Sequence, residues 1–456
     1  MSLDRETPPE LLAPIRSTEE LVEYMAGAEK PASEWKIGTE HEKIAVYARE
    51  LRPVPYEGER GIGALLQRIV DADGWTPVTE DGLLIGLQKD GASMSLEPGG
   101  QLELSGAPLR TIHETCREFT AHLALMKHVC EPFDIVWLGL GLHPIHTIDE
   151  IPRMPRARHQ IMRDYLPSRA SLPLEMMHMT GTVQANFDFA DELDMVRKLR
   201  VSLSLTPIVS AIYANSSLAG GKAAGFISRR MHIWRNTDPD RTGLLPFVFE
   251  PGFGYARYVE YALDVPMFFI VRNGRYLPAR GVPFRRFLED GLDEHRATLI
   301  DFERHLTTLF PEVRLKRGVF ELRGADAVPP DLTCSLPALW KGILYDAHAC
   351  EAAAALTAEW SADDRDYALE QVARHGLAAV LCGRPVLELA RELAAISREG
   401  LRRIRHLGRS GEDERRFLDP VDAQLDRGKS PGEVVLERWE GEWGRSFERL
   451  IEYARY

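Results

Sequence analysis

The stretch Gly38-Thr-Glu40-His-Glu42-Lys-Ile44-Ala-Val46 places two carboxylates two residues apart on a predicted β-strand. Successive residues of a strand point to opposite faces, so Glu40 and Glu42 share a face with Ile44 and Val46. A solvated face would not continue as apolar residues, and both carboxylates are therefore predicted to point inward. Charges of one sign held off the surface need a cation to neutralise them. The stretch thus predicts a strand that carries a metal site.

Three further segments alternate polar and apolar residues in the same way. Residues 93–105 form a predicted hairpin about Pro98-Gly-Gly100, with its two polar rows opposite each other. Residues 180–188 and 313–323 repeat the pattern. The polar side chains predicted to meet on one sheet are Glu40, Glu42, Glu97, Glu103, Gln184, Asn186, Arg314, Lys316, Glu321 and Arg323.

Two interpretations of these polar rows are open. Each strand taken alone is more typical of an antiparallel sheet with one wet face. The five carboxylates favour the other, because such acids on one surface repel each other unless divalent cations lie between them. Oxygen ligands select Mg²⁺ or Mn²⁺, and the usual partner of Mg²⁺ is a nucleotide triphosphate held by cations such as Arg314, Lys316 and Arg323. The sequence contains neither a P-loop nor a Rossmann glycine motif.

Composition narrows the class of protein. The formal net charge of −13 over 456 residues argues against a nucleic-acid binder. No apolar run is long enough to span a bilayer, and the opening residues resemble neither an export signal nor an organelle presequence. We therefore expect a cytoplasmic protein that acts on small molecules, as a monomer or homodimer. The five cysteines show no metal-binding spacing, and each is ordinarily a buried apolar residue.

The order of predicted elements is α+β and not alternating βαβ. A capping-box pattern at Ser17-Thr-Glu-Glu20 predicts an opening helix. From about Leu339 the pattern is nearly all helical. The predicted helices are 339–357, 363–375, 385–406, 420–427 and 431–456. We predict a helical lead-in over 1–35, a catalytic sheet domain over 36–345 and a helical region over 346–456.

A second group of cations occurs around Ser228-Arg-Arg230 and Asp240-Arg241. Arginine forks suit the carboxylates of an acidic small molecule. Clustered arginines are more often surface residues paired with acids, so surface ion pairs are the alternative to binding of an acidic small molecule.

Together these motifs resemble the plant and proteobacterial type of glutamate–cysteine ligase. The resemblance is carried by Ile37–Lys43, Ser95–Leu109, His232–Asp238, Asp240–Phe249, Tyr261–Met267, Phe310–Arg317, Glu321–Asp326, Leu336–Trp340 and Gly441–Gly444. It implies an ATP- and Mg²⁺-dependent ligase that joins the γ-carboxylate of glutamate to the amine of cysteine through a γ-glutamyl phosphate. The implied fold is glutamine-synthetase-like, an antiparallel sheet curled into a cup with helices on its outer face.

The resemblance also implies residue roles. Glu40, Glu42, Glu97, Glu103 and Glu321 would hold metal ions. Glu321 and Arg323 would be catalytic; ATP would meet Arg314, Lys316, Arg323, Gln184 and Asn186. Arg230, Arg241 and Tyr261 would bind the amino-acid substrates. Cys116 and Cys334 match a cysteine pair that forms a disulfide in plant relatives, and reduced thiols are the alternative.

Other functions remain open at this point. A related carboxylate–amine ligase would use a different amine acceptor. A phosphagen-type kinase would release a phosphorylated product without forming an amide. A non-catalytic scaffold is disfavoured, because a scaffold does not require carboxylates and arginines on its sheet faces.

Overall fold

The computed structural model describes residues 8–456. A nine-stranded antiparallel sheet forms its centre, in the order β14-β15-β7-β1-β5-β4-β3-β2, with β6 paired to β1. The strands are β1 (Ile37–Tyr47), β2 (Thr76–Glu80), β3 (Leu83–Lys89), β4 (Ala92–Leu96), β5 (Leu102–Ser105), β6 (Ile135–Leu138), β7 (Val183–Asp188), β14 (Val313–Lys316) and β15 (Val319–Leu322). The predicted α+β class and antiparallel sheet are confirmed.

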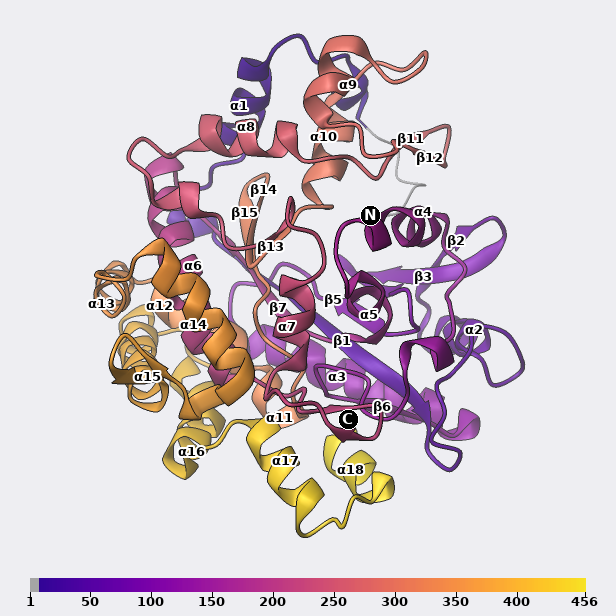
Figure 1. Cartoon of the computed structure of the whole chain (residues 1–456), viewed down its shortest axis with the longest axis vertical. Helices are drawn as coiled ribbons and strands as arrows, with labels where there is room; N and C mark the ends of the chain where they lie inside the picture. The colour runs from indigo at the N-terminus through magenta and orange to yellow at the C-terminus, as the bar shows by residue number, and fades with distance from the viewer. Residues whose placement is uncertain (1–7) are drawn as a thin grey trace.

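Strand β1 crosses the middle of the molecule (Figure 1). Its first half pairs with β5 and β7, and its second half pairs with β6. Ile44 and Val46 lie on the Glu40 face and pack into an apolar cluster with Trp439 near the C-terminus. On the opposite face His41 packs against Phe119, with ring centroids 4.7 Å apart. Because both faces of β1 are buried, apolar residues follow its carboxylates in the sequence.

Helices cover the back of the sheet (Figure 1). The helices before β15 are α1 (Thr18–Ala26), α2 (Ile62–Asp73), α3 (Ile112–Cys130), α4 (Ala157–Tyr165), α5 (Pro173–Met179), α6 (Glu192–Ile212), α7 (Arg229–Arg235), α8 (Tyr255–Asp264), α9 (Phe284–Asp290) and α10 (Leu299–Leu306). Those after it are α11 (Pro330–Thr333), α12 (Ser335–Leu344), α13 (Ala347–Ala355), α14 (Ala362–His375), α15 (Val386–Ile404), α16 (Asp419–Arg427), α17 (Pro431–Glu440) and α18 (Phe447–Ala454). Figure 1 shows α12–α16 gathered on one flank and α17 with α18 at the lower end.

Four two-stranded pairs complete the fold. The strands are β8 (Leu218–Ala219) with β9 (Lys222–Ala223), β10 (Thr242–Gly243) with β13 (Phe310–Pro311), β11 (Phe269–Arg272) with β12 (Arg275–Pro278), and β16 (Val380–Leu381) with β17 (Arg384–Pro385). Among the described residues no helix combines the length and the apolar character needed to cross a membrane.

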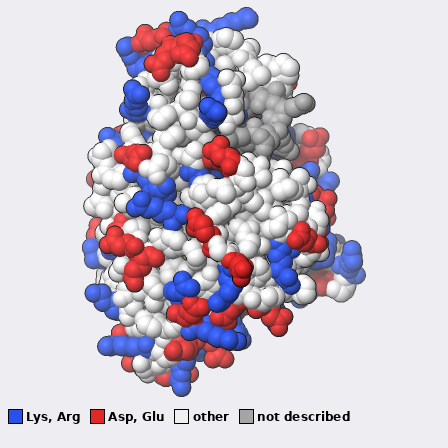
Figure 2. Space-filling view, turned by 90° about the vertical axis from the view of Figure 1, so that its right-hand side faces the viewer, with Lys and Arg blue, Asp and Glu red and all other residues white. Residues whose placement is uncertain are grey.

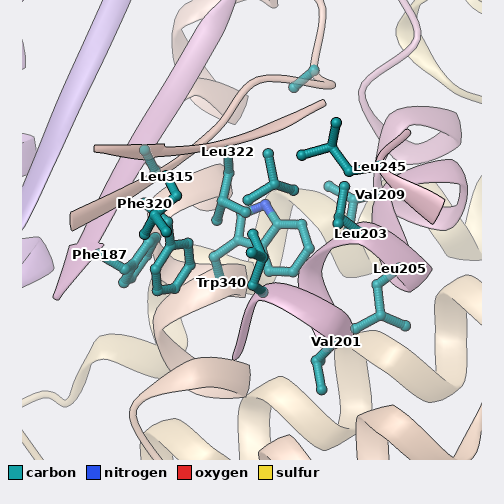
Figure 3. Close-up of a cluster of buried hydrophobic side chains, with 14 of the residues drawn as sticks. Phe187, Val201, Leu203, Leu205, Val209, Leu245, Leu315, Phe320, Leu322 and Trp340 are labelled. Atoms are coloured by element: carbon teal, nitrogen blue, oxygen red, sulfur yellow. The ribbon is translucent and has the colours of Figure 1, made fainter. Parts of the chain in front are cut away.

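The main core lies behind the sheet. Phe187, Phe320 and Leu322 project from β7 and β15 toward Trp340 of α12, and side chains of α6 such as Leu203 lie on its other side (Figure 3). Apolar side chains buried in this way contribute roughly 1.5–3 kcal/mol each. The core fixes the back of the sheet, so the polar rows face the other way.

Two predicted helices are each divided in the structure. The 339–357 segment breaks where Asp346 caps the start of α13, its side chain accepting from the backbone N of Ala349. The 431–456 segment breaks at residues 441–446, where Gly444 and Arg445 adopt positive φ angles of 53° and 62°. Periodicity alone misses such breaks because the apolar spacing continues on both sides of them. The predicted cap at Ser17 is confirmed, since its hydroxyl accepts from the backbone N of Glu20.

Candidate active site

A concavity of about 290 Å³ lies over the polar face of the sheet. Glu40 and Glu42 of β1, Glu103 of β5 and Glu97 of the adjoining turn all line it. Glu42 is directly opposite Glu103 in the β1–β5 register, and Ser95 is opposite Glu103 in the β4–β5 register. The hairpin therefore brings its two polar rows together, as its parity predicted.

The four carboxylates repel one another in this concavity. Burial, with the charge of Glu321 next, raises the pKa of Glu40 from 4.5 to about 7. Burial, with the charges of Glu97 and Glu103, raises the pKa of Glu42 well above its usual range. The pKa of Glu103 is raised by burial and by Glu97. Carboxylates held like this favour protons or bound cations over the free anionic form.

The donor set fits a hard divalent cation, because it consists of carboxylate oxygens. In the described part of the chain, however, no three acidic, imidazole or thiol side chains already converge on one point as a finished metal site. The glutamates are neighbours on adjacent strands and would have to turn toward a cation on binding. They supply the chemistry of a metal site without its final geometry.

Glu321 differs from the other four acids. It is fully buried and accepts two hydrogen bonds from Nη2 of Arg314, at 2.8 and 2.7 Å. Lys316 Nζ lies 2.6 Å from its Oε2, and Arg323 also donates to it. Burial alone would raise its pKa, but these three cations hold the pKa well below its usual range. Glu321 is thus the shared counter-ion of the cation cluster, and its role as a metal ligand stays a prediction.

The two predicted amides connect the cations to the carboxylates. Gln184 of β7 accepts from Nη1 of Arg323 at 2.8 Å. Asn186 of the same strand donates to Oε1 of Glu40 at 3.0 Å. Lys316 Nζ is 4.0 Å from Glu40. The predicted ATP-binding residues therefore form one network beside the acids.

A second concavity of about 640 Å³ lies next to this network. It shares the sheet face, since Gly38, Asn186 and Lys316 line it. Its remaining lining residues are Lys30, Ser33, Glu34, Lys36, Gly106, Pro108, Arg110, Asp188 and Val319. Sequence reasoning missed this space, because the 30–36 segment and Arg110 give no strand-like or helical motif that would connect them to the site.

The structure does not bring the three predicted substrate-binding residues to one place. Arg230 is buried and lines a small recess beside Trp234 and Arg323. Arg241 is fully buried, and it donates to Asp238 and to two backbone carbonyls. The Tyr261 hydroxyl is buried without a partner among the described residues. Arg241 and Tyr261 line neither concavity, so the structure does not bring them to the carboxylates.

Helix α4 contributes residues that the sequence analysis missed. Arg158 lines the first concavity, with Nη2 3.7 Å from Glu97, and His159 lies beside it. Met176, Met177, Trp234, Phe269 and Phe310 form a more apolar part of the wall. The run of arginines from Arg153 to Arg163 was the available signal, but it does not show which side of the helix meets the site.

The two matched cysteines are neighbours. All five thiols are free in this structure. A hydrogen bond with Cys334 lowers the pKa of the Cys116 thiol to about 7, and the same contact with burial raises the pKa of Cys334. The predicted pairing is close enough for a thiol–thiol contact, and a disulfide remains a prediction.

Comparisons with known proteins agree on one family. Residues 36–452 match a family model described as "Glutamate-cysteine ligase family 2(GCS2)". The chain is 44% identical over 441 residues to the chloroplastic glutamate–cysteine ligase of Brassica juncea, covering 96% of this chain and 84% of that one. The Arabidopsis thaliana enzyme is 43% identical, with 96% and 83% covered.

Solved structures support the fold. A glutamate–cysteine ligase from Francisella tularensis, crystallised with AMP, has a TM-score of 0.54 at 12% identity and covers 91% of this chain and 86% of that one. A bifunctional glutathione synthetase from Pasteurella multocida has a TM-score of 0.50 at 12% identity, covering 92% and 52%. The predicted glutamine-synthetase-like cup is confirmed.

One prediction is wrong. The pattern of the opening residues predicts a cytoplasmic protein, but the plant relatives that the chain matches are named chloroplastic enzymes, which contradicts that prediction. The lack of an export-signal or presequence pattern in the opening residues does not establish a compartment.

Proposed function

Because this chain belongs to glutamate–cysteine ligase family 2, we propose that it joins the γ-carboxylate of glutamate to the amine of cysteine at the expense of ATP. The product is γ-glutamylcysteine, and its formation is the first step of glutathione synthesis. The observation that carries the proposal is the single face on which four crowded glutamates adjoin the cations gathered by Glu321.

The reaction requires two displacements. A γ-carboxylate oxygen of glutamate attacks the γ-phosphorus of ATP, and ADP leaves. The cysteine amine then attacks the acyl carbon of the γ-glutamyl phosphate and loses a proton as phosphate departs. Most of the catalysis in such a transfer is electrostatic, because negative charge develops on oxygens that cations must hold.

The chain's own groups suit this task. We assign Arg314, Arg323 and Lys316 to phosphate oxygens, with Glu321 keeping the guanidinium groups oriented. Glu40, Glu42, Glu97 and Glu103 would hold Mg²⁺ or Mn²⁺, which supplies positive charge to the transferring phosphoryl group. The raised pKa values of Glu40, Glu42 and Glu103, each raised chiefly by burial, support this assignment, since a divalent cation would remove their mutual repulsion.

The two concavities suggest how the substrates divide the face. The larger one, with Lys36 and Arg110 on its wall, has room for the nucleoside end of ATP. The smaller one would take the amino acids. Arg158 is a cation on its wall that is not committed to Glu321, and it is suited to a substrate carboxylate.

A related ligase with another amine acceptor is the alternative, because Arg241 and Tyr261, expected to bind the amino acids, line neither concavity. Both are tested by incubating the protein with ATP, Mg²⁺, glutamate and either cysteine or another amine, and identifying products by mass spectrometry. We expect γ-glutamylcysteine with one ADP per amide. An amide formed faster with another amine would support the alternative, and ADP release without any amide would refute both.

A further inference from the structure

A single buried carboxylate, that of Asp326, ties together three loops behind the candidate active site. It accepts hydrogen bonds from the backbone N of Asn215 at 2.7 Å, from Oγ of Ser216 at 2.7 Å and from Oγ of Ser228 at 3.0 Å. Its residue is only 1% exposed. A Cβ on Gly141 would lie 2.5 Å from the carboxyl carbon of Asp326, so the absence of a side chain there gives the carboxylate its space.

The same two hydroxyls fix the first turn of α7. Ser228 is the N-cap of this helix, and its Oγ accepts from the backbone N of Met231 at 3.2 Å. Ser216 Oγ accepts from the backbone N of Arg230 at 3.0 Å. Each hydroxyl therefore donates to Asp326 while it accepts from the helix. The position of the first turn depends on the carboxylate through two serines.

Arg230 connects the Asp326 carboxylate to the candidate active site. Its Nη1 lies 3.8 Å from Oδ1 of Asp326, and its Nη2 donates to the carbonyl oxygen of Arg323 at 3.0 Å. Its charge also opposes the rise in the pKa of Glu42 that burial and Glu97 cause. The Arg230 guanidinium thus lies between the Asp326 carboxylate, the end of β15 and Glu42.

We propose that Asp326 is a positioning residue for the ligase reaction, which acts by holding Arg230 beside Arg323 and Glu42. This inference rests on the proposed function, since it concerns the same site. The side-chain hydrogen bonds of Asp326 go to Asn215, Ser216 and Ser228, none of which lines either concavity, and Arg230 joins its carboxylate to Arg323. Its effect on turnover should therefore be transmitted by that one side chain.

The test is a double-mutant cycle on ligase kinetics. Asp326→Asn keeps the size of the side chain and removes its charge, and displaced supporting groups of this kind typically cost about 10- to 100-fold. We expect the KM for ATP to rise by about tenfold or more, because Arg323 and Glu42 are assigned to its phosphates and metal, with the KM for glutamate changed less than about threefold. In an Arg230→Lys background the same change should cost less than about threefold. Equal losses in both backgrounds, or equal rises in both KM values, would overturn the proposal.

A milder variant guards against misfolding. Ser228→Ala removes one hydrogen bond to Asp326 together with the cap of α7, and Ser446→Ala removes the corresponding cap of the distant helix α18. Both should lower the melting temperature slightly, because a lost cap costs roughly 1 kcal/mol, which is about fivefold in the unfolding equilibrium. Only Ser228→Ala should raise the KM for ATP. Equal kinetics in the two variants would overturn the proposal, whereas an inactive wild type would instead refute the proposed function.

Discussion

Replacing Glu40 by glutamine should stabilise the metal-free protein and remove its ligase activity. Burial and the charge of Glu321 raise the pKa of Glu40 from 4.5 to about 7. Ionising this group in the folded protein therefore costs about 3 kcal/mol, at 1.36 kcal/mol per tenfold change in proton affinity. Below pH 4.5 the carboxyl is protonated in both folded and unfolded chains and costs nothing. The penalty grows as the pH rises and is complete above about 7.

The glutamine variant keeps the shape and an oxygen that can accept from Asn186. We therefore expect its free energy of unfolding in EDTA to exceed that of the wild type by up to about 3 kcal/mol at pH 8. The difference should shrink toward zero as the pH is lowered to 5. Urea unfolding followed by fluorescence measures it, and Glu57→Gln, at an exposed position, serves as the control that should change little.

Adding Mg²⁺ gives a second test of the role of Glu40. It should stabilise the wild type at pH 8, because a ligand that binds only the folded state shifts the unfolding equilibrium by mass action. It should stabilise the glutamine variant less. The reasoning would be refuted by a variant that is less stable than the wild type in EDTA at pH 8, since Glu40 would then be held by a net favourable pair with Lys316. Retention of full activity would refute the metal-binding role.

Three other changes test further parts of the molecule. Glu321→Gln leaves three clustered cations without their buried counter-ion, so it should cost about 3–5 kcal/mol of stability as well as activity, measured by urea unfolding; an unchanged midpoint would contradict this. Lys341→Ala isolates a fully buried carboxylate and should destabilise by a similar amount, whereas Lys429→Ala, at an exposed pair, should cost less than about 1 kcal/mol. Cys116, with a pKa lowered to about 7 by its hydrogen bond from Cys334, should be alkylated several-fold faster at pH 8 than at pH 6, and Cys334→Ala should slow that reaction at pH 7; a rate unaffected by the second change would remove the thiol contact as its cause.

The strand parity of the sequence was sufficient to predict the polar face. Alternation placed Glu97 and Glu103 on facing rows, and the observed Ser95–Glu103 register agrees. Arg314 and Glu321, both assigned to the polar rows, are directly opposite each other in the β14–β15 register. These predictions succeeded because side-chain direction in a strand depends only on the residue's place in the alternation.

Strand alternation does not predict where arginines outside the strands lie in the folded chain. Arg241 was expected at the substrate, yet three protein acceptors occupy its donors. Arg158 was not singled out, yet α4 holds it over the carboxylates. Nothing in the local pattern separates an arginine that turns into the core from one that turns toward a cavity. The choice is made by the packing of segments distant in sequence.

The mixed distribution of charge outside the site is also informative. On the face shown in Figure 2, Lys and Arg alternate with Asp and Glu and form no large region of one sign. Many exposed ion pairs, such as Arg285 with Glu260, account for the interspersed charges. The concentration of acids in the concavity is therefore a local arrangement and does not simply follow from the net charge.

The pairing of β1 has a consequence for biosynthesis. Gly38 is aligned with Asn186, and Asn186 with Glu321, so the face that carries the acids joins parts of the polypeptide separated by well over a hundred positions. During translation β1 leaves the ribosome long before β7 and β15 exist, and its inward carboxylates then lack the cations gathered at Glu321. A nascent chain arrested before the β14–β15 hairpin emerges should bind neither Mg²⁺ nor nucleotide. The chain would gain the ability to bind Mg²⁺ and nucleotide late in translation and in one step, when the β14–β15 hairpin pairs with β7.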